Sequence, residues 1–265
     1  MSAVLWTLDW PVNGTVSTFV DNFQSWLQPH LKSSNVVLVF DKYFDFSPKS
    51  STRAARAESV RYHKLGPHIP LPTKDAVLKC VANKQQLADL ICQGILSDDE
   101  YLTDNTPTNQ LILAGWPTDP ICIKRGKQMN YDLPSTHEEA DVILVQHAIY
   151  EANKSDQARI SFVSDDTDVF VLLLHFYQRQ NLTCPMIMAP AVHGRDTLDI
   201  KSTVRKHKDI IPSIVQMHAL TGCDTVAQTY NIGKITAVSV LQKGTSLTKL
   251  GNVDEPFEDV EKQAT

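Results

Sequence analysis

The chain has 265 residues, of which 42% are hydrophobic and 21% are charged, and its formal net charge is −5. This length fits one large domain or two small ones, with enough apolar residues for a packed core. The negative charge excludes a global positive field, so any nucleic-acid binding requires a local basic patch. The sequence has no long apolar span, no amino-terminal signal segment and no CxxC among its five cysteines, which predicts a nuclear or cytoplasmic protein with reduced thiols.

The first half of the chain contains predicted helices, predicted strands and a proline-rich stretch. A helix is predicted from residue 16 because apolar residues follow i, i+3, i+4 spacing through residue 27. Residues 35–41 read as a buried strand that ends on Asp41. Residues 66–132 are rich in proline, apart from a helix near 83–95 and a strand candidate at 110–115, and predict an inserted or cap region.

The second half repeats the alternation of strand and helix. Helical spacing starts again at residue 140, a strand is predicted over 159–166, and a helix follows over 167–178. A further strand candidate lies at 186–188, and a helix over 211–220 is ended by Gly222. This order predicts an α/β fold with a mostly parallel sheet flanked by helices, whose ligand site lies beyond the carboxyl ends of the strands.

Carboxylates gather where predicted strands end and predicted helices begin. Such a group repels itself unless a cation neutralises it, and oxygen ligands favour Mg²⁺ or Mn²⁺ over zinc. A single carboxylate after a strand is about as often a helix N-cap, so the hypothesis depends on the clusters together. The spacing leaves Glu138 and Glu139 as alternatives, since Glu139 converges with Asp141 only if a helix begins between them. The candidate metal ligands are Asp41, Glu138, Glu139, Asp141, Asp166, Asp168 and Asp224.

The order of these motifs resembles the flap endonucleases and related structure-specific 5′ nucleases of the PIN-like superfamily, over roughly residues 36–241. Val39-Phe40-Asp41, His137-Glu138-Glu139-Ala140-Asp141, Ser164-Asp165-Asp166-Thr167-Asp168 and Gly222-Cys223-Asp224 are similar to its acidic motifs. More narrowly, the residues of these motifs resemble those of uncharacterised animal PIN-like proteins, some linked to mobile elements. The resemblance implies a PIN-like, Rossmann-like domain over residues 1–250.

The resemblance also implies an activity and roles for residues. It implies phosphodiester hydrolysis with two Mg²⁺ or Mn²⁺ ions, and a nucleic-acid partner such as branched or flapped DNA, or RNA. Lys49, Arg53 and Arg56 match the basic residues that stabilise charge on the scissile phosphate. Gly233 and Lys234 match the hairpin of a helix–two-turns–helix segment, here residues 211–242, that holds the duplex backbone.

The two ends of the chain depart from the family pattern. The family's first strand supplies another aspartate, but here Asp9 falls too late to be its equivalent, so either the chain is truncated or the ligand is lost. The carboxyl end, residues 251–265, is acidic and polar, which predicts a disordered tail in place of the family's basic region.

Two other functions compete with the nuclease. A catalytically impaired PIN-like protein that binds nucleic acid or acts as a scaffold is favoured by the missing aspartate and the negative charge. A haloacid dehalogenase-type phosphatase would use Asp166-Thr167-Asp168 with Mg²⁺. The phosphatase is disfavoured because Phe170 stands where that motif has Thr or Val, and because it gives Glu139 and Asp224 no role.

Overall fold

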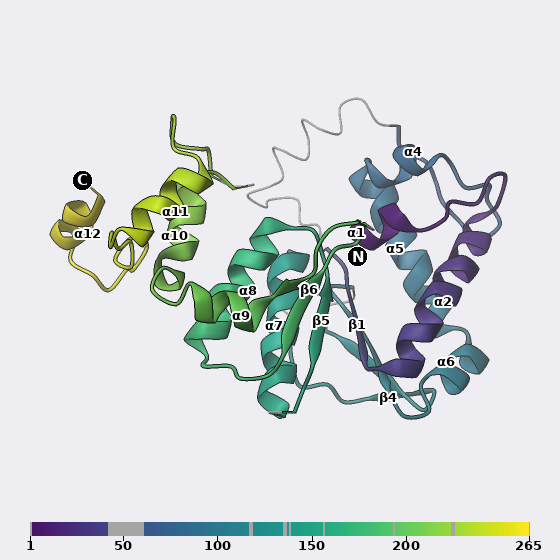
Figure 1. The fold of residues 1–265 in the computed structure, drawn as a ribbon. Helices are drawn as coiled ribbons and strands as arrows, with labels where there is room; N and C mark the ends of the chain where they lie inside the picture. Colours follow the sequence, from purple (N-terminus) through teal and green to yellow (C-terminus); the bar gives the residue numbers. More distant parts are fainter. Residues whose placement is uncertain are drawn as a thin grey trace. The chain divides into compact units, whose positions relative to one another are not determined.

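The computed structural model describes residues 2–41, 61–116, 119–134, 137, 139–155, 157–192, 194–223 and 226–264. The chain divides into two units, Met1–His147 and Ala148–Thr265, and the division falls inside helix α7 (Ala140–Lys154). Helices flank a small mixed sheet in each unit, which confirms the α/β class (Figure 1). A single mostly parallel sheet was predicted, whereas the described strands form two separate sheets, each with one parallel pair. The single domain predicted over residues 1–250 spans both units.

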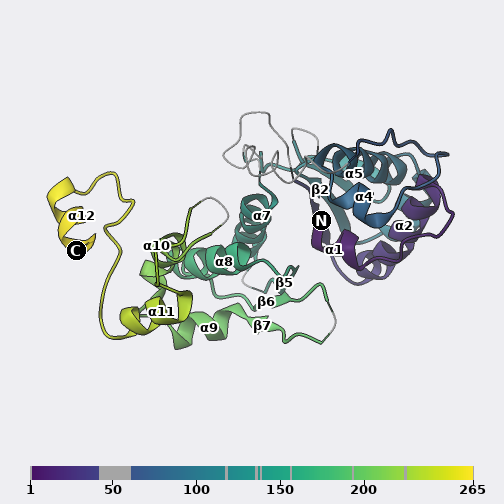
Figure 2. The same cartoon turned by 90° about the horizontal axis from the view of Figure 1, so that it is seen from above.

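The helical face predicted from residue 16 forms the centre of the first unit. Helix α2 (Val16–Ser33) is capped by Thr15, whose hydroxyl accepts from the Thr18 N–H in a capping box. Its apolar stripe is buried, and Phe19 and Phe23 within it are fully buried. Figure 2 shows α2 grouped with α1 (Ser2–Thr7), α4 (Lys74–Leu78) and α5 (Val81–Leu96). The 3.6-residue period therefore correctly identified a core helix.

The first sheet has the order β1-β2-β3-β4. Strand β1 (Val36–Val39) pairs parallel with β2 (Gln110–Ala114), and β3 (Ile121–Lys124) and β4 (Lys127–Met129) add antiparallel strands. Arg125 and Gly126 join β3 to β4, both with positive φ, as a two-residue type I′ hairpin requires. Both strands predicted in this half, 35–41 and 110–115, are confirmed.

The proline-rich segment 66–132 is part of this core rather than an insertion or cap. It supplies α4, α5, α6 (Asp99–Asn105) and three of the four strands of the first sheet. Leu87, Ile91 and Leu111 from this segment share one buried cluster with α2. The prolines lie outside the bounds of β2, β3 and β4, which is why they do not interrupt the sheet.

Asn83 of α5 ties down the chain around residues 61–63. Its side chain is fully buried, accepts from the His63 N–H at 2.9 Å, and donates to the carbonyls of Arg61 and Ala76 at 3.0 and 2.9 Å. We expect Asn83→Ala to lower the free energy of unfolding by about 2–4 kcal/mol, because three backbone groups lose their partner. Urea denaturation measures the loss. The control is Gln93→Ala, an exposed amide on the same helix, for which we expect a change within about 0.5 kcal/mol; equal losses would contradict the anchoring role.

The second unit is built on a strand–helix–strand crossover. Strand β5 (Ile160–Val163) leads into α8 (Thr167–Arg179), and the chain returns as β6 (Met186–Ala189), parallel to β5 and beside it in Figure 1. Strand β7 (Leu198–Asp199) adds an antiparallel edge before α9 (Ile200–Lys206). The predicted strands at 159–166 and 186–188 and the helix at 167–178 are confirmed.

The rest of the second unit is helical. The segment predicted over 211–220 is a 3₁₀ turn, η1 (Ile211–Ser213), followed by α10 (Ile214–Leu220), and Gly222 with φ +92° ends it. The described residues 221–223 and 226–233 are not helical and precede α11 (Lys234–Gln242), and α10 and α11 with these residues are called the helix–loop–helix. Helix α12 (Phe257–Ala264) stands where a disordered tail was predicted, and Lys249 pairs with Glu255 and Asp259 at its start. No helix among the described residues is both long and apolar enough to cross a membrane.

Candidate metal centre

Asp166 and Asp168 are held by the turn that joins β5 to α8. Asp166 is the N-cap of α8, and its Oδ1 accepts from the Asp168 N–H at 2.8 Å. The Asp166 N–H donates to Ser164 Oγ at 3.1 Å. The alternative role considered for Asp166, a helix cap, is therefore confirmed. The same bond fixes the direction of its carboxylate beside Asp168.

The neighbouring carboxylate, Asp165, is used differently. Its Oδ1 accepts from Arg195 Nη1 and its Oδ2 accepts from the Ala191 N–H, both at 3.0 Å. Asp165 thus ties the loop after β6 to the end of β5. Although it is adjacent to Asp166 in sequence, its two oxygens are occupied by a guanidinium and a backbone amide.

Asp141 lies in the first turn of α7. The helix begins at Ala140, and the Glu139 carbonyl accepts from the Ile143 N–H at 3.1 Å. Glu139 therefore stands at the N-cap position, and the helix does begin between Glu139 and Asp141. The sequence analysis required a helix start at this point if the carboxylates of Glu139 and Asp141 were to converge. The structure describes both residues, but it places only Asp141 in the group defined below.

Asp41 anchors the start of α7 to the end of β1. Its Oδ1 accepts from the Ala140 N–H at 3.3 Å, and its Oδ2 lies 3.6 Å from Lys84 Nζ. Ile143, one turn further along α7, packs against Val39 of β1. A carboxylate at a helix N-terminus also interacts favourably with the helix dipole. Asp41 thereby fixes the helix turn that carries Asp141.

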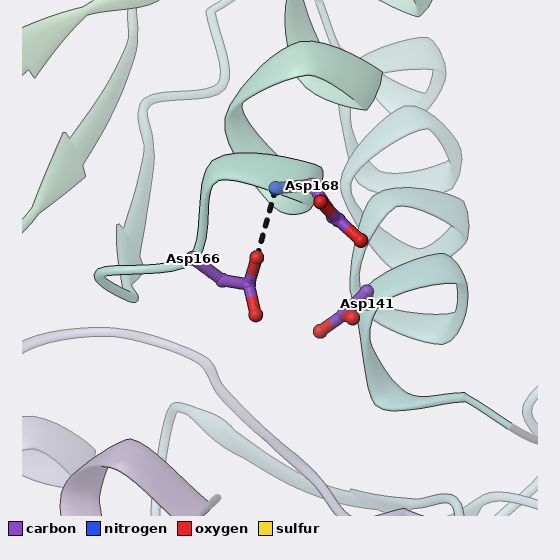
Figure 3. Close-up of side chains that lie close together, drawn as sticks. All are labelled: Asp141, Asp166 and Asp168. Atoms are coloured by element: carbon purple, nitrogen blue, oxygen red, sulfur yellow. Dashed lines mark hydrogen bonds between the residues drawn. The ribbon is translucent and has the colours of Figure 1, made fainter. Parts of the chain in front are cut away.

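Asp141, Asp166 and Asp168 form the one group of potential metal ligands found among the residues that the structure describes. Each offers one carboxylate oxygen, and these oxygens all lie within 4.8 Å of one another. Figure 3 shows Asp166 and Asp168 at the start of α8, and Asp141 at the start of α7. These three are among the carboxylates predicted from the strand ends and helix starts, and that they act together as metal ligands stays a prediction.

The donor set and the spacing fit a hard divalent cation. Opposite ligands of Mg²⁺ stand about 4.2 Å apart, at twice its 2.0–2.1 Å bond length, which is comparable with the 4.8 Å limit that encloses these three oxygens. Without a cation, two charges 4.8 Å apart repel by between about 1 and 3.5 kcal/mol, depending on how well water screens them. Three all-oxygen ligands select Mg²⁺, Mn²⁺ or Ca²⁺ over zinc. The group could therefore bind a metal ion.

None of the other predicted site residues that the structure describes belongs to this group. Asp41 and Glu139 are described and lie outside it. Five others fall outside the described residues, so their part in a site stays a prediction: Lys49, Arg53, Arg56, Glu138 and Asp224.

Asp168 has a buried partner that lies fifty residues away in the sequence. His218 of α10 is 8% exposed, and its Nε2 lies 2.7 Å from Asp168 Oδ1. Its burial and this contact make His218 a core residue with a polar partner. On its other side, Nδ1 lies 3.0 Å from Lys234 Nζ. No local spacing relates Lys234 to His218 or Asp168, so sequence reasoning could not find the chain of contacts.

Gly233 and Lys234 were predicted to hold a nucleic-acid backbone. Gly233 is the N-cap residue of α11, with extended backbone angles. The Lys234 ammonium makes its contacts inside the protein, with His218, with the Gly222 carbonyl at 2.8 Å and with Thr221 Oγ1 at 3.5 Å. The geometry thus gives Lys234 a role within the helix–loop–helix.

Comparison with known proteins gives no relative from which a function could be transferred. No protein-family model matches this sequence, and neither a curated protein nor a solved structure is significantly similar to it.

Proposed function

We propose that the protein is a metal-dependent phosphodiester hydrolase that acts on DNA or RNA, in the manner of the structure-specific 5′ nucleases that its motifs resemble. The group formed by Asp141, Asp166 and Asp168 carries the proposal, because three carboxylates within 4.8 Å provide the oxygen ligands that such chemistry requires. The β5–α8 turn that bears two of them also agrees with the motif order of that family. Branched or flapped DNA is the substrate class that the resemblance favours.

Among the described residues, three would bind the metal ion and one anchors the helix turn that carries a ligand. Asp141, Asp166 and Asp168 would hold Mg²⁺ or Mn²⁺, which supplies Lewis-acid polarisation of a phosphate oxygen when bound. Asp41 holds the turn of α7 that carries Asp141. A second ion, as the resemblance implies, needs further ligands, for which Glu138 and Asp224 are the candidates. Lys49, Arg53 and Arg56 are proposed to stabilise charge on the phosphate.

A second candidate is a PIN-like protein that binds nucleic acid with impaired catalysis. It is favoured by the amino-terminal segment, where the resembled family has a strand ending in an aspartate. Here Ser2–Thr7 is helix α1, and Asp9 follows it as an exposed residue. One carboxylate fewer in a two-metal site lowers the charge available to hold the second ion.

A cleavage assay separates the two candidates. The full chain is incubated with flap, hairpin, nicked and single-stranded substrates in Mg²⁺, in Mn²⁺ and in EDTA. We expect cleavage that requires the divalent ion. Binding to these substrates without cleavage in either metal would replace the nuclease by the binding protein, and the absence of both would overturn each proposal.

Metal binding should also stabilise the fold, independently of any substrate. We expect Mn²⁺ or Mg²⁺ to raise the melting temperature relative to EDTA, because a ligand that binds only the folded state adds about 2.7 kcal/mol at one hundred times its Kd. Differential scanning calorimetry measures the shift. The control is NaCl in EDTA at matched ionic strength, which reports the general effect of salt on the charged surface. Identical melting temperatures in this control and in both divalent metals would contradict a metal site.

A further inference from the structure

Asp168 is the end of a chain of three polar side chains within the second unit. Lys234, the first residue of α11, places its Nζ 3.0 Å from His218 Nδ1, and His218 Nε2 lies 2.7 Å from Asp168 Oδ1. His218 is buried, and it links the partly exposed side chains of Lys234 at the start of α11 and Asp168 at the start of α8.

The chemistry of these groups sets the direction of each hydrogen bond. A lysine ammonium can only donate, so Nδ1 of His218 must accept. The ring proton is then on Nε2, which donates to the Asp168 carboxylate. The ammonium is itself held by the Gly222 carbonyl and by Thr221 Oγ1, so its three donors have three acceptors. The residues after α10 thus hold a charge that, together with the Asp168 carboxylate, favours the Nε2–H tautomer of His218.

We propose that Lys234 and His218 are positioning residues that orient the Asp168 carboxylate for a divalent cation. This inference rests on the proposed metal site. Partners behind a ligand commonly set its orientation, and their loss costs about 10–100-fold in metal affinity. Without Lys234, a neutral ring is able to carry its proton on Nδ1. It then turns a lone pair toward the carboxylate, and Asp168 loses its donor.

The first test compares Mn²⁺ affinity in two lysine variants of the full chain by isothermal titration calorimetry. We expect Lys234→Met to bind Mn²⁺ about tenfold more weakly than wild type. The control is Lys243→Met, an exposed lysine at the end of the same helix, which removes the same charge. A purely Coulombic effect has the opposite sign, because removing a nearby positive charge strengthens cation binding.

A second variant preserves the donor without the ring. In His218→Gln the side-chain amide nitrogen stands near the place of Nε2, so we expect Mn²⁺ affinity close to wild type. Adding Lys234→Met to this background should then change the affinity little, since no tautomer remains to be selected. His218→Phe removes the donor, and we expect about a tenfold loss. If Lys234→Met weakens Mn²⁺ binding as much in the His218→Gln background as in wild type, then Lys234 does not act through the His218 ring, and the proposal is overturned.

The tautomer is observable without metal or substrate. A long-range ¹H–¹⁵N NMR spectrum of the metal-free protein should show His218 protonated on Nε2 in wild type, and a shift toward the Nδ1 tautomer in Lys234→Met. If wild type binds Mn²⁺ but Lys234→Met binds it equally well, or if wild-type His218 carries its proton on Nδ1, the positioning role is overturned while the metal site stands. If wild type binds no Mn²⁺, the proposed function fails and the positioning role fails with it.

Discussion

Replacing Asp168 with asparagine is expected to abolish divalent-dependent cleavage and to remove the metal-induced rise in melting temperature. The amide is nearly the shape of the carboxylate, and its oxygen still accepts from His218 Nε2, so the contact observed at 2.7 Å is kept. What changes is the charge offered to the cation. Since loss of a supporting residue alone costs about 10–100-fold, loss of a direct ligand should cost at least about a hundredfold in activity and metal affinity. Initial cleavage rates and calorimetric Kd values measure both.

The matched control is Asp165→Asn, three residues earlier in the same turn. Asp165 is adjacent to the group in sequence, but its oxygens accept from Arg195 and from the Ala191 N–H. We expect this variant to retain metal affinity, although its loop is less firmly tied. Equal loss of Mn²⁺ affinity in the two variants would show that general acidity of the turn, rather than ligation by Asp168, attracts the cation. Unchanged cleavage in Asp168→Asn would remove Asp168 from the site.

Gly115→Ala is expected to be the most destabilising single substitution considered for the first unit. Gly115 follows β2 with φ +76°, and an added Cβ would lie 1.8 Å from the Phe40 carbonyl oxygen. That oxygen belongs to the backbone between β1 and Asp41, so it cannot rotate away. Left-handed backbone alone costs an alanine about 1–2 kcal/mol, and the clash raises the expected loss to at least about 4 kcal/mol. Urea denaturation at 25 °C measures it.

Gly244→Ala separates the two causes of that loss. Gly244 also has a positive φ, +101°, but nothing lies within 4 Å of an added Cβ. We expect this variant to lose only about 1–2 kcal/mol, which is the backbone term. Equal losses at the two positions would show that the close approach of β2 to Phe40 is not important for stability. Because Phe40 precedes Asp41, a folded Gly115→Ala protein should also show a disturbed start of α7.

The elements with strong local periodicity were predictable from the sequence alone. The apolar stripe of α2, the strands that became β1, β2, β5 and β6, and the stop of α10 at Gly222 all appear where they were predicted. Each depends on residues within a few positions of one another. The presence of carboxylates after β5 and at the start of α7 was readable in the same way, because strand ends and helix starts are local features.

Tertiary structure alone decided which of these elements and side chains meet. Strands β1 and β2 pair although some seventy residues separate them. This pairing makes the proline-rich segment part of the first core. Strands β5 and β6 pair with each other in a second sheet. Asp141 is grouped with Asp166 and Asp168 as a possible metal ligand. Asp41 instead anchors α7, because it accepts a hydrogen bond from the Ala140 N–H while Ile143 packs against β1. The inward direction of Lys234 depends on a loop that brings Gly222, Thr221 and His218 around one ammonium. The sequence by itself determined the local elements and the acidic chemistry, whereas contacts between distant residues, which no local period encodes, decided the ligand group and its support.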